Sequence, residues 1–340
     1  MSPAATGPEP ITAVIPCRNA AAFLSETIGS VRAQSRAVAE VIVVDDASTD
    51  GSAELAERLG ATVIRHGEQR GNGAARNTGL RAARTGLVAL LDADDVWLPP
   101  HVATVASLLE RYPEADVAFS GLRLIGEGVG PGTPLHTPRL DEGPPQRAFH
   151  KCLRHDIGQP SACLLRREAA LSIGGFDETM PLGVDFDMHL RLAARFLFVA
   201  TWEITVLYRK HGGQISTDQP QRVPWCFRAR ERAWRTLVDA GDVAGAEAAG
   251  VIIREAWDGA LRKAWDDRNR RDLDMLVALA PLIPGGEDQR RKWSRRAAVP
   301  QPLLALWSLP GDWIRIPIRR ALHWLEGRRA RGTGAGTGTA

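Results

Sequence analysis

The 340-residue sequence predicts an α/β fold: a Rossmann-like, mostly parallel sheet with helices on both faces, followed by a C-terminal helical extension. Two observations predict the sheet. Short apolar runs alternate with helical stretches over residues 11–91, which is typical of parallel strands joined by crossover helices. Acidic clusters follow two of those runs, where a ligand-binding edge is expected. A third observation, the helical character from Gln221 onward, predicts the extension.

The order of the predicted elements follows the hydrophobic pattern. Val41–Val44 is wholly apolar and is closed by two aspartates, as expected of a strand buried on both faces. The predicted elements are strands over 11–16, 41–44, 61–65 and 87–91, helices over about 20–34, 54–59 and 72–84, then strands over 161–166 and 196–208 and a helix over 185–195. A Gly- and Pro-rich stretch over 126–145 predicts a long loop between the two groups.

Composition narrows the function classes. A net charge of +3 is too small to indicate a nucleic-acid partner, although the segment from Glu287 onward is basic, with eleven Lys/Arg against four Asp/Glu. The four cysteines form no CxxC pair, which argues against a zinc site and a disulfide framework. With no secretory signal at the start and no apolar run approaching ~18 residues, we expect a cytoplasmic protein.

The acidic clusters Asp45-Asp46 and Asp92-Ala93-Asp94-Asp95 both follow predicted strands, so we expect them to share one crevice. Asp92-Ala93-Asp94 is a D-x-D element, and two such carboxylates suit a hard divalent cation that bridges phosphate oxygens. The alternative is that these aspartates are ordinary turn and helix-cap residues.

Four segments together resemble the family 2 glycosyltransferases, which are inverting enzymes with the GT-A fold. The segments come in the family's order and spacing over residues 11–100, and the resemblance continues more loosely to about residue 217. They are Ile15–Asn19 (IPCRN), Val43–Gly51 (VVDDASTDG), Gly71–Gly79 (GNGAARNTG) and Leu91–Asp95 (LDADD). The resemblance implies a GT-A domain over 11–217, with a nucleotide-binding half at 11–120 and an acceptor half at 146–217. The sequence pattern predicts a helical region at 218–330, and composition predicts disordered ends at 1–10, which are small and Pro-rich, and at 331–340, which are low-complexity Gly, Thr and Ala.

The resemblance also implies roles for single residues. Asp94 would be the direct ligand of Mn²⁺ or Mg²⁺, and His211, in the matching Tyr208–Ser216 segment, would join the metal or phosphate shell. Asp95 would assist or cap the following turn. For Arg76 and His211, an ordinary helix-surface arginine and an ordinary surface or core histidine remain alternatives. The implied nucleotide-binding residues are Pro16, Asn19, Asp45, Asp46, Arg76 and Asp92.

In the acceptor half, Gly174–Glu178 resembles the family's G-G-F-D-E segment, and Asp185 falls where the family has its base. Val184 replaces the Glu that usually precedes that base, which removes a second carboxylate. In an inverting transfer, one carboxylate takes the proton from the acceptor hydroxyl, and a metal stabilises the leaving diphosphate. The alternative for Asp185 is a helix N-cap.

The resemblance therefore implies a metal-dependent glycosyltransferase that moves a sugar from a nucleotide-sugar donor to a hydroxyl acceptor in glycan, polysaccharide or glycoconjugate synthesis, such as that of the cell envelope. UDP is the default carrier, with GDP and dTDP left open. A catalytically inactive sugar-nucleotide-binding module and a nucleotidyltransferase are the alternatives. A dinucleotide enzyme is disfavoured, because the loop Pro16–Asn19 contains no glycine.

The basic C-terminal segment carries Ile318, Leu322 and Leu325 at helical spacing beside several arginines. Such a helix suits an anionic membrane surface, which would place the protein peripherally at the inner face of the cell membrane near a lipid-linked acceptor. The alternative is a helix that packs on the domain with a solvated basic face.

Overall fold

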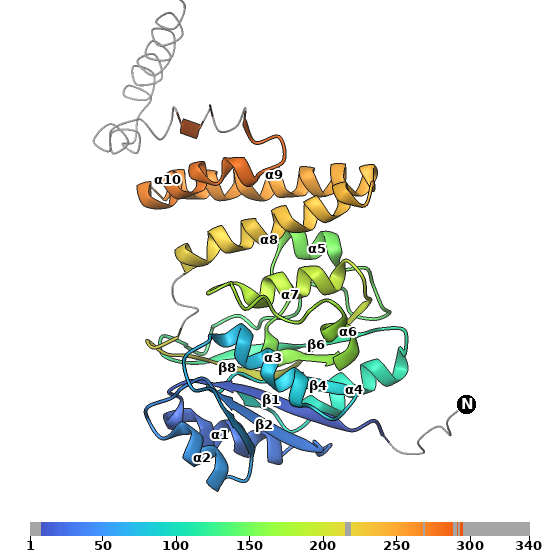
Figure 1. The fold of residues 1–340 in the computed structure, drawn as a ribbon, viewed down its shortest axis with the longest axis vertical. Coiled ribbons are helices and arrows are strands. Elements are labelled where there is room, and N and C mark those ends of the chain that lie inside the picture. Colours follow the sequence, from blue (N-terminus) through green and yellow to red (C-terminus); the bar gives the residue numbers. More distant parts are fainter. Residues whose placement is uncertain (1–7, 215–218, 268, 288–290, 292, 295–340) are drawn as a thin grey trace, which may run out of the picture. The chain divides into compact units, whose positions relative to one another are not determined.

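The computed structural model describes residues 8–214, 219–267, 269–287, 291, 293 and 294. Eight strands in this part of the chain form one sheet in the order β3-β2-β1-β4-β7-β6-β8-β5 (Figure 1). The strands are β1 (Ile11–Cys17), β2 (Glu40–Asp45), β3 (Thr62–Arg65), β4 (Leu87–Leu90), β5 (Val96–Trp97), β6 (Val117–Gly126), β7 (Cys163–Arg166) and β8 (Phe198–Lys210). The α-helices are α1 (Ala21–Arg32), α2 (Ser52–Arg58), α3 (Asn72–Ala82), α4 (His101–Arg111), α5 (Phe149–Arg154), α6 (Arg167–Ser172), α7 (Val184–Ala193), α8 (Gln219–Asp239), α9 (Val243–Asp266) and α10 (Arg270–Ala278).

The first four strands along the chain, β1 to β4, pair in parallel, as the sequence predicts. Alternate residues of β1 face opposite sides of the sheet. Ala13 and Ile15 belong to one buried cluster with Leu24 of α1. On the other face, α3 lies so close to Val14 that a Cβ on Gly79 would stand 2.2 Å from Val14 Cγ1. Helices therefore cover both faces, with α1 on one side and α3 on the other (Figure 1).

The remaining strands make the sheet mixed. β7 pairs antiparallel with both β4 and β6, β6 pairs in parallel with β8, and β5 pairs antiparallel with β8. The predicted strand over 161–166 begins later, at Cys163, after a 3₁₀ turn at Pro160–Ala162. Inserting the antiparallel β7 beside β4 brings the acceptor half next to the parallel half in a single sheet.

The chain divides into two compact units, residues 1–252 and 253–340. The first holds the sheet and α8. In the described part of the second unit, Trp257 is buried and its Nε1 donates to the carbonyl of Leu276 at 2.8 Å. The predicted basic helix around residues 318–325 and the predicted disordered tail at 331–340 lie outside the described residues. In the described part of the chain, no helix is both long and apolar enough to cross a membrane.

Candidate active site

The two acidic clusters lie at the same edge of the sheet. β1 pairs in parallel with β2 on one side and β4 on the other, so the carboxyl ends of all three strands point the same way. The edge is formed by Pro16–Asn19 at the end of β1 and in the loop that follows, Asp45-Asp46 at the end of β2, and Asp92–Asp95 after β4. This pairing places both clusters at one edge of the sheet, and the crevice expected there stays a prediction.

Pro16 and Asn19 shape the first loop from within. Pro16 is buried in β1 opposite Val44 of β2. Asn19 has a left-handed φ of 49°, its backbone N–H donates to Ser48 Oγ at 2.9 Å, and its Oδ1 accepts from the backbone N–H of Thr49 at 2.8 Å. The side-chain oxygen of Asn19 therefore joins the β1 and β2 loops to one another.

Asp46 uses both of its carboxylate oxygens inside the protein. Oδ1 accepts from the backbone N–H of Arg70 at 2.8 Å and lies 2.8 Å from His66 Nδ1, while Oδ2 accepts from the backbone N–H of Gly71 at 2.8 Å. Burial opposes ionisation here, but the hydrogen bonds from His66 and from the two amides hold the pKa of Asp46 below its usual range. Asp46 therefore anchors the loop that leads into α3.

Asp45 is differently surrounded. Its Oδ2 accepts from the backbone N–H of Ser48 at 3.2 Å, whereas its Oδ1 is buried and has no hydrogen-bond partner among the described residues. Asn72 Oδ1, at the start of α3, is a second buried acceptor without a partner there. Because buried polar atoms are nearly always hydrogen-bonded, these oxygens mark places where an N–H or O–H of a ligand or water would bind.

Arg76 is buried, with 2% of its surface exposed, so the alternative of a helix-surface arginine is wrong. Its Nη2 donates to Asp92 Oδ1 at 2.5 Å, and its guanidinium lies over the ring of Phe176, 5.4 Å from the centroid. Burial raises the pKa of Asp92 and the charge of Asp94 adds to this, against the attraction of Arg76. Arg76 thus links α3 both to the D-x-D element and to the G-G-F-D-E segment.

Asp94 and His211 meet although they are far apart in the sequence. Asp94 Oδ2 lies 3.0 Å from His211 Nε2 and accepts from Gln214 Nε2 at 3.2 Å. Both the Asp94 and His211 side chains are partly exposed, at 23% and 21%. His211 also packs on the ring of Phe23 from α1, with the ring centroids 4.7 Å apart. The pair is therefore accessible from solvent and is positioned by the end of β8.

Both carboxylate oxygens of Asp95 are hydrogen-bonded within the protein. It is fully buried, its Oδ2 accepts from Ser161 Oγ at 2.5 Å, and its Oδ1 accepts from the backbone N–H of Arg209 at 2.9 Å. Burial raises the pKa of Asp95 well above its usual range, and the charges of Asp94 and Asp92 add to this effect. Asp95 therefore ties the end of β4 to the turn before β7 and to β8.

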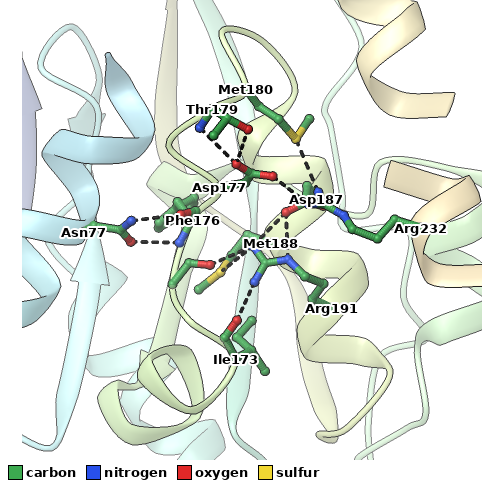
Figure 2. Close-up of polar contacts among 11 residues, drawn as sticks. Asn77, Ile173, Phe176, Asp177, Thr179, Met180, Asp187, Met188, Arg191 and Arg232 are labelled. Carbon is green, nitrogen blue, oxygen red and sulfur yellow. Dashed lines mark hydrogen bonds and ion pairs between the residues drawn. The ribbon is translucent and has the colours of Figure 1, made fainter. Parts of the chain in front are cut away.

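The G-G-F-D-E segment is held against α3 by Asn77 (Figure 2). The Asn77 side chain accepts from the backbone N–H of Phe176 and donates to the carbonyl of the same residue, both at 2.8 Å, and also donates to Glu178 Oε1 at 2.9 Å. Gly175 has a φ of 71°, and a Cβ there would stand 2.3 Å from Asn77 Oδ1. Only glycine fits this position without displacing Asn77.

A second network fixes the first turns of α7. Figure 2 shows the buried Asp187 between Arg191 of the same helix and Arg232 of α8. Arg191 also donates to the carbonyls of Ile173 and Gly175, at 2.8 and 2.7 Å, and Arg232 reaches Asp177 at 2.6 Å. The helix that carries Asp185 is thereby fastened to both the G-G-F-D-E segment and α8.

Asp185 is the second residue of α7, and the N-cap is Gly183, with a φ of 72°. The alternative that Asp185 caps the helix is therefore wrong. Both of its carboxylate oxygens face Arg222 Nη2 of α8, at 3.4 and 3.5 Å. Burial alone would raise the pKa of Asp185, but the guanidinium groups of Arg222 and Arg76 hold it below its usual range. An ionised carboxylate with 17% of its side chain exposed results.

Val184, the departure from the family pattern, is buried and packs beside Gly73 of α3, where a Cβ would stand 3.5 Å from Val184 Cγ1. A second carboxylate nevertheless lies near Asp185, because Asp156 Oδ2 accepts from Arg222 Nη2 at 2.5 Å. Sequence reasoning misses Asp156 and Arg222. Neither belongs to a short motif, and 66 residues separate them.

Comparison with known proteins bears directly on this arrangement. A sequence model described as glycosyl transferase family 2 matches residues 12–174. The chain is 31% identical over 211 residues to an uncharacterized glycosyltransferase of Mycobacterium bovis, covering 59% of this chain and 85% of that protein. The chain belongs to glycosyl transferase family 2.

Within glycosyl transferase family 2, the chain is also 37% identical over 193 residues to a pre-mycofactocin glycosyltransferase of Mycobacterium tuberculosis. That match covers 54% of this chain but only 38% of the mycobacterial protein.

Solved structures agree on the GT-A fold of this family 2 member. TarS residues 1–349 of S. aureus, in complex with UDP-GlcNAc, superpose with a TM-score of 0.60 at 15% identity, covering 97% of this chain and 94% of TarS 1–349. A mannosyltransferase of Pyrobaculum calidifontis, in complex with GDP-Man and Mn²⁺, gives a TM-score of 0.52 at 19% identity and covers 85% of each chain.

Proposed function

We propose that this glycosyltransferase moves a sugar from a nucleoside-diphosphate sugar, with UDP the favoured carrier, to an acceptor hydroxyl with inversion at the anomeric carbon. One observation carries the proposal. Arg76 binds Asp92 on the proposed donor side at 2.5 Å and, together with Arg222 and against the effect of burial, holds the pKa of Asp185 on the proposed acceptor side below its usual range. The two halves of the chain therefore bring their charged groups to one place, as a transfer between two substrates requires.

Asp45 is the residue we assign to the nucleotide base. Its Oδ1 is the buried acceptor without a partner among the described residues, whereas both oxygens of Asp46 are already engaged. The ring N–H of uracil would supply the missing donor, and guanine offers N–H groups as well. The unpartnered oxygen of Asp45 therefore favours a nucleotide base that carries a ring N–H. The choice of UDP as the carrier is supported by the similar TarS structure in complex with UDP-GlcNAc.

The donor set at Asp94 and His211 fits a divalent metal. Adjacent ligands of an octahedral ion with bonds of about 2.1 Å are about 3 Å apart, and Asp94 Oδ2 lies 3.0 Å from His211 Nε2. Within the described residues, no three His, Cys, Asp or Glu side chains gather as a metal cage. In the proposal, an Mn²⁺ or Mg²⁺ ion would take its remaining ligands from the donor phosphates and water, as such ions commonly do. The bound ion would stabilise the charge that develops on the leaving diphosphate.

Asp185 is the residue we propose as the base. It is ionised well below neutral pH and partly exposed, so it can accept the proton of an acceptor hydroxyl as that oxygen attacks the anomeric carbon. The C1–O bond to the diphosphate breaks as the new C1–O bond forms, so one carboxylate suffices and the configuration inverts. An acidic group for the leaving diphosphate is not needed, unlike in glycoside hydrolysis.

The acceptor belongs to glycan, polysaccharide or glycoconjugate synthesis in this proposal. Two further parts of the proposal are a lipid-linked acceptor and a peripheral location at the inner face of the cell membrane. Both rest on the basic sequence from Glu287 onward, most of which lies outside the described residues.

The test is turnover of UDP-, GDP- and dTDP-sugars with Mn²⁺, measured as release of the nucleoside diphosphate, for the wild type and for Asp185→Asn. We expect one carrier to be turned over, with water as acceptor where no other is present, and the variant to lose roughly 10²- to 10⁴-fold in rate while binding the nucleotide unchanged. Equal rates in both proteins would exclude Asp185 as the base. Nucleotide binding without turnover of any donor would instead favour the inactive binding module.

A further inference from the structure

Two charged side chains, Asp156 and Arg222, meet the proposed base Asp185 from separate segments of the chain. Asp156 follows α5, Asp185 lies in the first turn of α7, and Arg222 lies on α8. Arg222 Nη2 is 2.5 Å from Asp156 Oδ2 and 3.4 Å from Asp185 Oδ1, so one guanidinium is shared by two carboxylates. All three side chains are mostly buried, at 22%, 23% and 17% exposure for Arg222, Asp156 and Asp185.

Among the described residues, Arg222 is the cation in ion-pair contact with both Asp156 and Asp185, and a replacement would have to come from a neighbouring side chain. His189 is the nearest candidate on α7, with Nδ1 4.0 Å from Asp156 Oδ1, but burial lowers its pKa to about 4, so it is neutral at physiological pH. Arg76 is engaged with Asp92 at 2.5 Å. When two carboxylates share a buried site, ionising both costs free energy because the like charges repel, unless an opposite charge lies between them.

The pKa of Asp156 reflects its burial and the repulsion between the two carboxylates. Burial raises the pKa of Asp156 to about 6, and the charge of Asp185 adds to the rise, against the attraction of Arg222. Asp185 instead titrates below its usual range. The shared guanidinium favours the ionised form of both carboxylates, and Asp156 holds it through the shorter contact.

We propose that Arg222 is a positioning residue for Asp185, held in place by Asp156, and that it keeps the proposed base ionised. This inference rests on the proposed role of Asp185 as base. In this chain the second carboxylate near the base comes from Asp156, after α5, rather than from position 184. The charged and titratable groups that face Asp185 are Arg222 and Cys226 on α8, Arg76 on α3, Asp92 after β4, Asp156 after α5 and His189 on α7.

The test is a ¹³C NMR titration of the protein alone, labelled at the aspartate carboxyl carbons, with the Asp185 signal assigned by its loss in Asp185→Asn. In Arg222→Gln we expect the titration midpoint of Asp185 to rise by about one unit or more, since an opposite charge at this range moves a pKa by about 1–3 units. Arg222→Lys should restore most of the shift. Arg228→Gln, which removes an exposed arginine of the same helix, should leave the midpoint unchanged.

A paired variant guards against misfolding. The double variant Asp156→Asn/Arg222→Gln removes the Asp156 carboxylate together with the guanidinium that it binds, so no unpaired carboxylate is left buried at position 156. We expect the titration midpoint of Asp185 to be higher in this double variant than in Asp156→Asn alone. An unchanged Asp185 midpoint in folded Arg222→Gln, or equal midpoints in the double and single variants, would overturn the proposal. The titration needs no substrate, so it tests the effect of Arg222 independently of the role of Asp185 as catalytic base. If the Asp185 midpoint shifts in Arg222→Gln but turnover is undiminished in Asp185→Asn, Arg222 controls the ionisation of Asp185, and Asp185 is not the catalytic base.

Discussion

At the scale of single residues, the neighbouring aspartates Asp45 and Asp46 have different environments. Asp46 is bound through both oxygens by two backbone amides and lies against His66, whereas Asp45 keeps one buried oxygen without a partner among the described residues. A sequence motif treats the two aspartates alike, because it records residue type and spacing. Their surroundings give Asp46 a structural role and support the proposed nucleotide-binding role of Asp45.

This difference predicts opposite effects of two matched substitutions. Asp46→Asn should lower the free energy of unfolding by about 1–3 kcal/mol, because an amide group would face a backbone donor in place of an oxygen. Asp45→Asn should leave unfolding nearly unchanged and weaken nucleotide binding about ten-fold or more. Urea denaturation measures the free energy of unfolding, and nucleotide titration measures the affinity. If Asp45→Asn lowers stability and Asp46→Asn weakens nucleotide binding, the proposal that Asp45 binds the nucleotide base is rejected.

At the scale of elements, α7 is positioned by contacts that no local pattern contains. The turn Gly174-Gly175 packs on Asn77 of α3, and Arg191 returns from α7 to the carbonyl of Gly175. A Cβ at Gly175 would meet Asn77 Oδ1 at 2.3 Å, and the left-handed φ of 71° is itself costly for other residues. The position of Asp185 therefore depends on a glycine in the preceding turn.

Gly175→Ala should accordingly destabilise the first unit by at least about 1–2 kcal/mol and reduce turnover more than nucleotide binding, because it displaces the acceptor half. Thermal unfolding and donor turnover are the measurements. Gly130→Ala is the matched control, since a Cβ there meets nothing within 4 Å. Equal stability of the two variants would show that the turn tolerates a side chain.

Much of the parallel half could be predicted from the sequence, because each strand is a short apolar run and each helix has its own local pattern. The order of β6, β7 and β8 could not, because antiparallel insertion of β7 is decided by pairing between distant segments. The same holds in the site. Asp92, Asp94 and Asp185 lie in motifs, while Asp156 and Arg222 meet only through the packing of α8 on α7.

At the scale of the whole molecule, the sheet brings together residues that lie far apart in the sequence of the first unit. Asp94 and His211 are 117 residues apart in the sequence, yet they lie 3.0 Å apart because β8 ends beside the turn after β4. The first unit, residues 1–252, thus contains the proposed metal ligands, the proposed nucleotide-binding residues and the proposed base. The proposed metal-dependent donor binding therefore depends on residues of that unit alone.

Calorimetric titration of the protein with UDP, with GDP and dTDP in parallel, in Mn²⁺ or in EDTA, tests the central claim most directly. We expect metal-dependent binding of one nucleotide to the wild type, its loss in EDTA and in Asp94→Ala, and its retention in Asp141→Ala, which removes an exposed aspartate of the 126–145 loop. Failure of every nucleotide to bind in Mn²⁺, or equal binding to the wild type and Asp94→Ala, would contradict a metal-dependent donor site at this edge of the sheet.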